Sequence, residues 1–286
     1  MSTLPVSARV SVARMRTRRA LNAPLMWGVG ILVLLLAASF IVPAVSGWGT
    51  EQPNPGASLA SPSLAHLFGT DESGFDIFTR VFYAPRIDLP VAAAGVALGM
   101  VVGVALGVAA GSARGWLGEA VMRVADMIQA FPLFILAIAL VALSGNHLSN
   151  IVFALAFLNA PIFLRLVRSR TVTIREHRFI EAAVALGNSP QRVLWRHIMP
   201  NAIGPAIVQA GISMGYAILT VAGLAFLGVG VQVPTPEWGS MILTGRNDIT
   251  TGQWWTEIFP GLALALAVVA FNLCSEGVER ARELSR

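Results

Sequence analysis

Residues 89–111 read LPVAAAGVALGMVVGVALGVAAG and contain no charged side chain. A transmembrane helix needs about 20 largely apolar residues to cross roughly 30 Å of hydrocarbon, so this stretch is long enough to span a membrane. Its glycines recur at every fourth position: Gly95, Gly99, Gly103, Gly107 and Gly111. Such a stripe leaves one helix face bare, which predicts close packing against another helix.

Further uncharged runs along the chain have about the length of a membrane span. They cover residues 25–45, 127–145, 148–164, part of 198–236, and 258–275. The 198–236 stretch is too long for one crossing, so it must include extra backbone on one side of the membrane. The runs together predict an all-α integral membrane protein with six transmembrane helices.

The composition agrees with a membrane protein. Hydrophobic residues make up 55% of the chain and charged residues only 12%, against about 25% charged residues in soluble domains. All 20 residues counted as Lys+Arg are arginines. A phosphate-binding P-loop needs a lysine to reach the β- and γ-phosphates, so the chain has no Walker A site of the usual kind.

The positions of the arginines predict the orientation of the chain. With the N-terminus inside, residues 1–24, 112–126, 165–197 and 276–286 face the cytoplasm and hold 17 of the 20 arginines. This bias favours two cytoplasmic termini. It also argues against nucleic-acid binding, because the basic residues are shared among short loops beside anionic lipid. The run at 25–45 exceeds the roughly 7–15 apolar residues of a signal peptide, which favours a retained anchor over a cleaved signal.

The predicted topology divides the chain into segments. These are a cytoplasmic N-terminal segment (1–24), a first transmembrane helix (25–46), an extracytoplasmic segment (47–88), a five-helix core (89–276) with a cytoplasmic loop (165–197), and a cytoplasmic tail (277–286). The extracytoplasmic segment contains an amphipathic pattern formed by Phe75, Ile77, Phe78, Val81 and Phe82. We expect this short helix to lie at the membrane surface.

The sequence offers little catalytic chemistry. The predicted spans carry no ionisable residue at their centres, where a secondary transporter or proton pump usually keeps one. Asp126 follows Arg123 by three residues, which predicts an ion pair at a helix end. The histidines lack metal-binding spacing, and no nucleophile–base or paired-carboxylate arrangement is evident. We therefore expect no catalytic residue, no metal site and no cofactor in this chain.

The most informative polar segment lies between the fourth and fifth spans and reads REHRFIEAAVALGNSP, residues 175–190. Glu176 suits the positive end of a helix dipole and Gly187 supplies a stop, which predicts a helix over 176–189. The Ser-Pro pair that follows suits the N-cap and first turn of a second helix. We expect that second helix to end at Met199, before the next proline.

The 176–189 helix has the character of a docking element. Its adjacent alanines let another surface approach closely, and Phe179, Ile180 and Leu186 offer apolar anchors, as in a helix laid into a groove. An alanine-rich helix that ends in glycine is common, so the pattern alone is weak evidence. Its place between two spans makes it more specific.

The string Glu181-Ala182-Ala183-x3-Gly187 in this position resembles the EAA loop of permease subunits of binding-protein-dependent ABC importers. Further strings in the same order resemble the dipeptide/oligopeptide/nickel branch, and within it the DppC/OppC-like subunit of the permease pair. These strings include LFGTD (67–71), AFP (130–132), RLVR (165–168), RHIMPN (196–201), LAFLGVGVQ (224–232) and WGSM (238–241).

The resemblance implies a type I (MetI-like) ABC importer permease fold, multi-pass in a bacterial inner membrane. It further implies a half-channel that pairs with a paralogous permease, binds two cytoplasmic ATPases that hold ATP and Mg, and receives solute from an extracytoplasmic binding protein. The expected ATPase-coupling residues are Arg178, Phe179, Ile180, Glu181, Ala182, Ala183, Leu186 and Gly187. A bulky charged residue at Ala183 or Gly187 is expected to uncouple transport from ATP hydrolysis without preventing insertion.

The solute and the outer face stay open at the level of sequence. Di- or oligopeptides are the default solute, nickel or another small compound is the alternative, and a stand-alone channel or secondary carrier is a minor one. Gln232, Trp238 and Gly239 are candidates for an outer gate or for contact with the binding protein, and membrane anchoring is the competing interpretation of Trp238. Relatives usually read Gly-Arg-Asp where this chain has Gly74-Phe75-Asp76, so the role of that arginine is open here.

Overall fold

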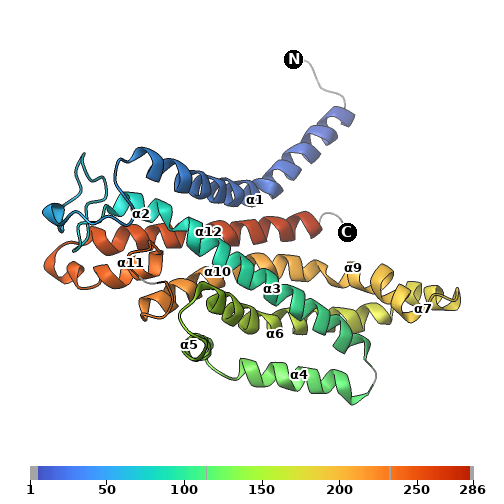
Figure 1. Ribbon diagram of the computed structural model, residues 1–286. Coiled ribbons are helices and arrows are strands. Elements are labelled where there is room, and N and C mark those ends of the chain that lie inside the picture. Colours follow the sequence, from blue (N-terminus) through green and yellow to red (C-terminus); the bar gives the residue numbers. More distant parts are fainter. Residues whose placement is uncertain (1–5, 114, 232, 284–286) are drawn as a thin grey trace.

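The computed structural model of the chain describes residues 6–113, 115–231 and 233–283 (Figure 1). Among these residues, β structure is confined to one isolated antiparallel bridge between Thr70 and Asp76. The predicted all-α class is confirmed. The helices are α1 (Val6–Val45), α2 (Ile77–Tyr83), α3 (Pro85–Ser112), α4 (Trp116–Gln129), α5 (Leu133–Ser144), α6 (Leu148–Arg175), α7 (Arg178–Ala185), α8 (Pro190–Val193), α9 (Met199–Ala202), α10 (Gly204–Phe226), α11 (Trp238–Gly245) and α12 (Trp255–Glu283).

The described residues include five helices that are long and apolar enough to cross a membrane, or six spans if one bent pair counts as a span. The five are Ala23–Val45, Ile77–Ser112, Leu148–Arg175, Gly204–Phe226 and Trp255–Arg282. The bent pair is α4 and α5, which meet at an angle of 91°. The six predicted runs therefore correspond to these five helices and the bent pair.

The run predicted as a span over 127–145 does not form one uninterrupted helix. The chain leaves helical geometry at Ala130–Pro132, because proline lacks an N–H and disfavours the helical conformation of the residue before it. Pro132 instead becomes the N-cap of α5. At 1.5 Å per residue, the 12 residues of α5 extend only about 18 Å, which is too short to cross the hydrocarbon alone.

Several helices continue well past the apolar runs that predicted them. The second span starts at Ile77 instead of Leu89, the fourth ends at Arg175 instead of Leu164, and α12 extends through the predicted tail to Glu283. Charged residues end an apolar run, but arginine and glutamate are good helix formers. The cytoplasmic loop predicted at 165–197 therefore begins as three further turns of α6.

The short helix predicted to lie on the membrane surface is instead part of the packed core. In α2, Ile77 and Val81 are buried, and they pack with Met241 of α11 and Trp255 of α12. Only Ala84 separates α2 from α3, so the two helices form one continuous span. The period of the apolar residues was read correctly, but those residues face protein and not lipid.

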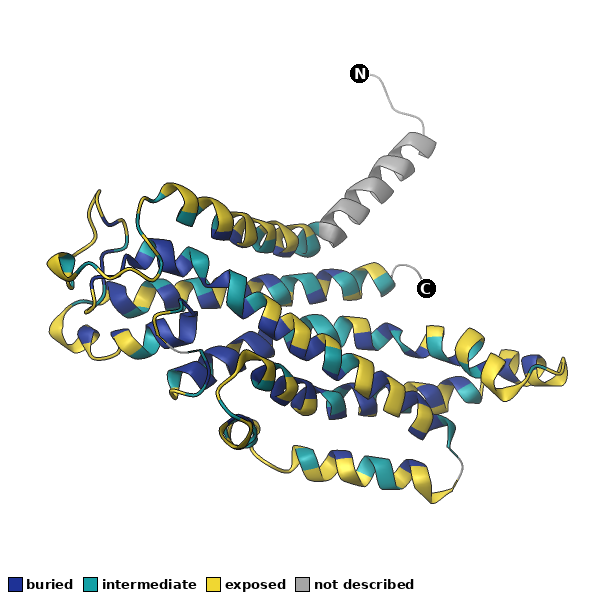
Figure 2. Ribbon diagram, in the orientation of Figure 1, coloured by how far each residue is buried: buried dark blue, intermediate teal, exposed yellow. Residues whose placement is uncertain are grey.

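The glycine stripe of α3 faces α6. A methyl group on Gly95 would lie 2.5 Å from Cβ of Leu155, and one on Gly103 would lie 2.4 Å from the carbonyl oxygen of Ala160. Gly99, Gly107 and Gly111 meet the same helix at comparable distances. Because no side chain intervenes, the two backbones approach closely along the whole length of the stripe. Figure 2 shows the buried faces of these helices turned toward each other.

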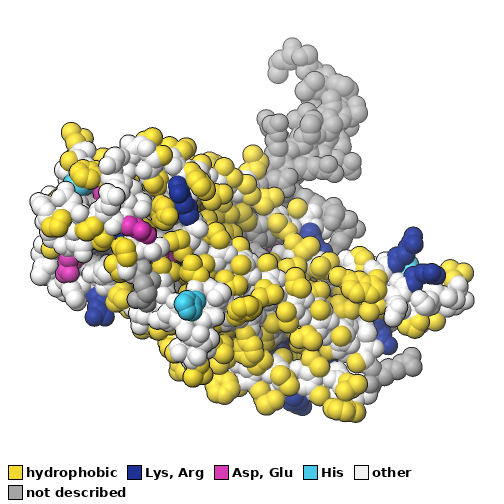
Figure 3. All heavy atoms as spheres, in the orientation of Figure 1, with side chains coloured by type: hydrophobic (Ala, Val, Ile, Leu, Met, Phe, Trp, Pro, Cys, Tyr) yellow, Lys and Arg dark blue, Asp and Glu magenta, His cyan; other side chains and the backbone are white. Residues whose placement is uncertain are grey.

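The remaining helices surround this pair. In Figure 1, α1 and α12 lie side by side, α10 packs against both α12 and α3, and α4 runs along α6. α6 is the central helix. In its most apolar 18-residue stretch 61% of the residues are buried, against 17% in the corresponding stretch of α1. Figure 3 shows hydrophobic side chains over the middle of the molecule, and charged side chains mainly toward the two ends. We call these the α7 end and the α11 end.

Candidate coupling helix and buried cap

The α7 helix lies at one extremity of the molecule, and its end is well defined (Figure 1). Gly187 adopts φ +77°, in the left-handed region that favours glycine. Its N–H donates to the carbonyl of Val184, and the N–H of Asn188 donates to the carbonyl of Ala183. This pair of bonds is a Schellman motif, so Gly187 ends the helix as the sequence predicted. The helix is shorter than predicted, because it begins at Arg178 and ends at Ala185.

The predicted coupling residues occupy two different faces of α7. Ile180 and Ala183 are buried against the protein. Phe179, Ala182 and Leu186, which are spaced by three and four residues, share the neighbouring face and are exposed. Leu186 is 83% exposed. Arg178 and Glu181 are also exposed and flank this apolar face.

A cavity of about 800 Å³ lies beneath α7 and separates it from the ends of α3 and α6. Arg175, at the end of α6, lines this cavity and donates from Nη1 to the carbonyls of Gly111 and Ser112 at 3.0 and 3.1 Å. A cation at these last carbonyls of α3 satisfies groups that have no partner within the helix. Arg175 therefore ties the chain that leads into α7 directly to the packed α3–α6 pair.

The helix after α7 does not end at Met199 as predicted. Ser189 caps α8 by accepting a hydrogen bond from the N–H of Arg192, but the helical path then continues through a π-helical turn at Leu194–Ile198 into α9. Pro200 lies in the first turn of α9, where its missing N–H costs little. The wider π turn that precedes it accommodates the proline, and Gly204 begins α10.

Two ion pairs hold α4 against α6. Asp126 Oδ1 accepts from Arg165 Nη2 at 2.6 Å, and Glu119 pairs with Arg168. Asp126 therefore pairs across helices, and the predicted pair with Arg123 was wrong. Both pairs are substantially exposed on at least one side, so each contributes little stability, roughly 0–1 kcal/mol.

The opposite end of the molecule is a cap in which the loop before α2 packs against α11 and α12. Thr70 Oγ1 accepts from the N–H of Ala60 at 2.8 Å, and the carbonyl of Thr70 accepts from Trp255 Nε1 at 3.1 Å. Asp76 caps α2 and accepts from His66 Nδ1 at 2.9 Å. Gly74, at φ +79°, has no room for a side chain, because a methyl group would lie 1.9 Å from the carbonyl oxygen of Asn54.

Phe75, which stands where relatives usually have arginine, is buried under Arg80. The guanidinium lies 4.2 Å from the centre of the Phe75 ring, which is a favourable cation–π geometry. Arg80 also donates from Nη1 to the carbonyls of Thr50 and Pro234, at 2.8 and 2.9 Å. A single arginine thus joins the loop before α2 to the segment before α11.

Trp238 and Gly239 are internal. Trp238 has no exposed surface, and its Nε1 donates to the carbonyl of Val81 at 3.0 Å. A fully buried side chain is contrary to membrane anchoring and to direct contact of Trp238 with a binding protein, whereas an outer-gate role of Trp238 and Gly239 stays a prediction. A methyl group on Gly239 would lie 2.1 Å from the carbonyl oxygen of Ala222 in α10, so this glycine permits close packing. Gln232, the third candidate, lies outside the described residues.

Asp88 and Glu237 form a buried carboxyl pair that the sequence did not reveal. Glu237 is the N-cap of α11, and its two oxygens accept from the N–H groups of Gly239 and Ser240 at 2.8 and 2.7 Å. Asp88 Oδ2 accepts from the N–H of Trp238 at 3.3 Å. Both carboxyl groups are buried and lie within electrostatic reach of each other, so protonation of one of them relieves the repulsion between the two.

Glu237 had a recognisable signal as a cap, because an acidic residue directly before a helix start is a common N-cap. Its contact with Asp88 had none, since 149 positions separate the two in the printed sequence. Burial raises the pKa of Glu237 to about 7, although hydrogen bonds from Gly239 and Ser240 oppose that rise. The pair holds the start of α3 against the start of α11.

We predict that the cap loosens as the pH rises through about 7. Because the pKa of Glu237 is raised on folding, its contribution to stability is full below pH 4.5, the usual pKa, and is lost as the pH passes the folded value. Hydrogen exchange of the α11 amides, corrected for its intrinsic pH dependence, should show a loss of protection on the order of tenfold between pH 5.5 and pH 8.

A substitution of Asp88 tests this prediction. Asp88→Asn replaces the neighbouring carboxyl group by an amide, which removes its negative charge and favours the ionised form of Glu237, so the pH dependence should flatten. Asp126→Asn, which removes an exposed carboxylate of α4 outside the cap, is the matched control and should leave the dependence unchanged. An unchanged slope in Asp88→Asn would show that the pair is not its origin.

Among the described residues, no group of three or more His, Cys, Asp or Glu side chains is arranged to hold a metal ion. The geometry instead consists of a packed helical core, a cap at one end, and a short helix at the other that presents an unpaired apolar face.

Comparison with known proteins places this geometry in a family. Residues 103–283 match the family described as "Binding-protein-dependent transport system inner membrane component". The chain is 41% identical over 258 residues to the dipeptide transport system permease protein DppC of Alkalihalophilus pseudofirmus, covering 88% of this chain and 84% of that protein. It is 38% identical to the glutathione transport system permease protein GsiD of Pectobacterium atrosepticum, covering 98% of this chain and 95% of that protein.

A solved structure shares the fold. The chain is similar to an inward-facing form of the MetNI methionine ABC transporter, with a TM-score of 0.58 and 18% identity, over 72% of this chain and 97% of the matched chain. The predicted type I permease fold is therefore confirmed. From the extent of these matches, the chain belongs to the inner-membrane permease components of binding-protein-dependent transport systems, which are non-catalytic multi-pass membrane subunits.

Proposed function

We propose that this chain is one half of the translocation channel of an ATP-driven peptide importer, and that α7 is the helix through which separate ATPases act on it. The observation that carries the proposal is the exposed apolar face formed by Phe179, Ala182 and Leu186. An apolar helix face at the tip of a molecule suits the groove of another protein. The surplus of arginines on loops at the same end supports a cytoplasmic location for α7.

The proposed partners are a paralogous permease, two ATPases and an extracytoplasmic binding protein. The paralogous permease would complete the channel, and each ATPase would offer a surface groove, one of which would receive α7. Movement of α7 would reach the core through Arg175, whose hydrogen bonds join the end of α6 to the end of α3. The result would be a rigid-body shift of α3 and α6 between two arrangements.

Peptides are the proposed class of solute. The support is the similarity to permeases of dipeptide and glutathione systems, at 41% and 38% identity over most of the chain. Nickel or another small compound is the competing class.

The test is uptake into proteoliposomes that contain this chain, its paired permease and its ATPases, with the binding protein and radiolabelled solute on the outside. We expect ATP-dependent accumulation of a dipeptide or glutathione and none of nickel. Liposomes with this chain alone test the stand-alone channel and should show no flux. Accumulation of nickel, or flux without ATP, would contradict the proposal.

A further inference from the structure

A groove runs along α10 on the face that the core leaves open. Two adjoining cavities form it, of about 280 Å³ near the α7 end and about 220 Å³ farther along α10. Ile212 lines both cavities, so they are neighbours along α10. The cavity farther along α10 lies between α10 and α12, where Gly215 leaves room for the side chain of Asn272.

Two polar groups face this groove at membrane depth. Tyr216 is 68% exposed and lies near the middle of α10, and Asn272 is exposed on α12. Neither side chain forms a hydrogen bond with another described residue. An amide without a partner is costly in hydrocarbon, by several kcal/mol as an order of magnitude. This face is therefore turned away from lipid.

The end of the groove nearest α7 is charged. Arg170, Glu279 and Arg282 line it together with Gln209, whose Nε2 donates to Ser213 Oγ at 3.5 Å. Charged and amide groups of both signs suit the ends and backbone of a zwitterionic peptide. They would be poor partners for lipid chains.

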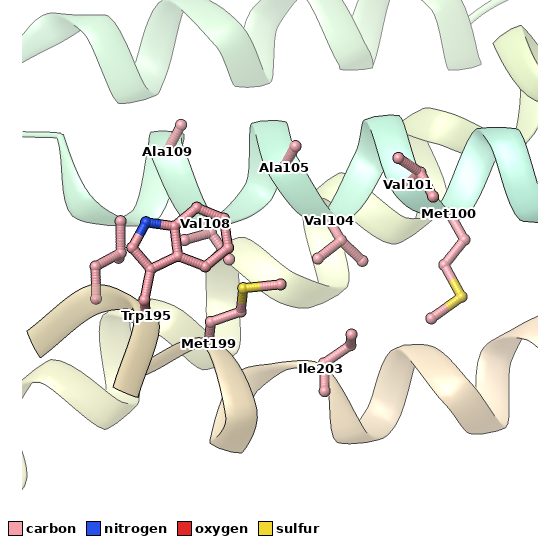
Figure 4. A pocket seen from close by; sticks show the side chains of 10 residues that line it. Met100, Val101, Val104, Ala105, Val108, Ala109, Trp195, Met199 and Ile203 are labelled. Atoms are coloured by element: carbon pink, nitrogen blue, oxygen red, sulfur yellow. The ribbon is translucent and has the colours of Figure 1, made fainter. Parts of the chain in front are cut away.

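A further cavity in the bundle has the opposite character. It has a volume of about 460 Å³ and lies between α3 and the segment from Leu194 to Ile203. Figure 4 shows valine, alanine and methionine side chains around it, with Trp195 at one side. Its lining is apolar throughout, apart from the indole N–H of that tryptophan. A polar solute would lose its hydrogen bonds there, so of the two this cavity is the unsuitable route.

We propose that the groove between α10 and α12 is this chain's share of the solute path, and that Tyr216 and Asn272 hydrogen-bond the backbone of a passing peptide. The inference rests on the proposed function and makes it more specific. An amide offers both a donor and an acceptor, and the phenol offers the same, so they match peptide groups without reading side chains. That suits an importer that accepts peptides of varied sequence.

Thiol labelling tests whether the groove is wet. The assembled transporter, in membrane vesicles and in a Cys274→Ser background, carries Tyr216→Cys, Asn272→Cys or Leu266→Cys. Leu266 is the matched control, because it is also exposed on α12 but points about 120° away from Asn272. The cysteine thiolate, which forms only in contact with water, attacks the sulfur of a charged, membrane-impermeant thiosulfonate reagent, forms a disulfide and releases a sulfinate.

We expect the cysteines introduced at positions 216 and 272 to react at least about tenfold faster than the one at 266, and saturating peptide-loaded binding protein with ATP should slow them. Equal, slow labelling at all three positions would overturn the inference. So would efficient cross-linking of the cysteine at 272 to the paired permease combined with slow labelling, because the groove would then be a subunit interface.

Uptake kinetics supply the second measurement. Asn272→Leu should raise the KM for peptide by about three- to tenfold, which is the range for one lost hydrogen bond. Asn272→Gln, which keeps the amide, should bring the KM most of the way back to the value of the unsubstituted protein. An unchanged KM in Asn272→Leu would exclude the contact. If the unsubstituted assembly fails to import peptide, the proposed function fails, but the labelling rates still report whether the groove contains water.

Discussion

Ala182→Arg should abolish ATP-driven uptake while leaving the subunit folded and inserted. Ala182 is at the centre of the exposed face of α7, between Phe179 and Leu186. A long cation there would be forced into the apolar groove that receives the helix. We expect Ala182 to lie at a hot spot of the interface, where a disruptive change costs about 2 kcal/mol of binding or more, so the affinity for the ATPases should fall about 30-fold or more.

The matched control is Val184→Arg. Val184 is 57% exposed on the same helix, but it points about 160° away from Ala182, toward the cavity beneath α7. Co-purification of the ATPases and peptide uptake should both be lost in Ala182→Arg and retained in Val184→Arg. Equal effects of the two substitutions would exclude docking through this face, and retention of both activities in Ala182→Arg would do the same.

Burial changes the expectation for the two positions singled out from the sequence. Ala183 is buried, so a charged residue there would destabilise α7 itself before it affected docking. Gly187 has open space around it but a positive φ, so a larger residue there would strain the end of the helix. Thermal unfolding separates these variants from Ala182→Arg, in which the folded subunit should be unchanged.

The sequence predicted the spans well because hydrophobicity is a local property. Each apolar run corresponds to a helix or to half of the bent pair, and the glycines of α3 indicated a close helix contact whose partner proved to be α6. The errors arose where a helix and the apolar run that predicted it end at different residues. Charged residues after Leu164 continue α6, whereas Pro132 breaks an uncharged run. Pro132 was the residue in the sequence that could have indicated the break, but a prediction from hydropathy alone takes no account of proline.

The cap could not be predicted, because its contacts join distant parts of the chain. Trp238 looked like a surface aromatic in a polar segment, yet its indole reaches Val81 in another helix. The carboxyl groups of Asp88 and Glu237 each looked unremarkable alone. A sequence indicates where a helix and its N-cap lie, but it does not reveal which segments meet. Asn272 lies within the uncharged run at 258–275, and its unpaired amide becomes evident only in the folded bundle.

Gly103→Leu should have the largest effect on folding. The side chain would meet the carbonyl of Ala160 and Cβ of Phe163 at distances that no contact tolerates, since even a methyl group would lie 2.4 and 2.6 Å away. The helix backbone cannot shift locally to make room, so α3 and α6 must move apart along the glycine stripe where they pack. Overpacking typically costs about 1–3 kcal/mol, and we expect the upper part of this range or more. The yield of monodisperse, detergent-extracted protein and its unfolding temperature should both fall sharply.

Gly261→Ala in α12 separates packing from helix propensity. Gly261 is also in a membrane-spanning helix, but nothing lies within 4 Å of where its Cβ would be. Alanine there should be neutral or stabilising by up to about 1 kcal/mol, because glycine is the poorer helix former. If Gly103→Ala, the smallest possible change at the stripe, were equally harmless, α3 and α6 would not be in backbone contact in the membrane. A graded loss from alanine to leucine at Gly103, with no loss at Gly261, is the result that close helix packing requires.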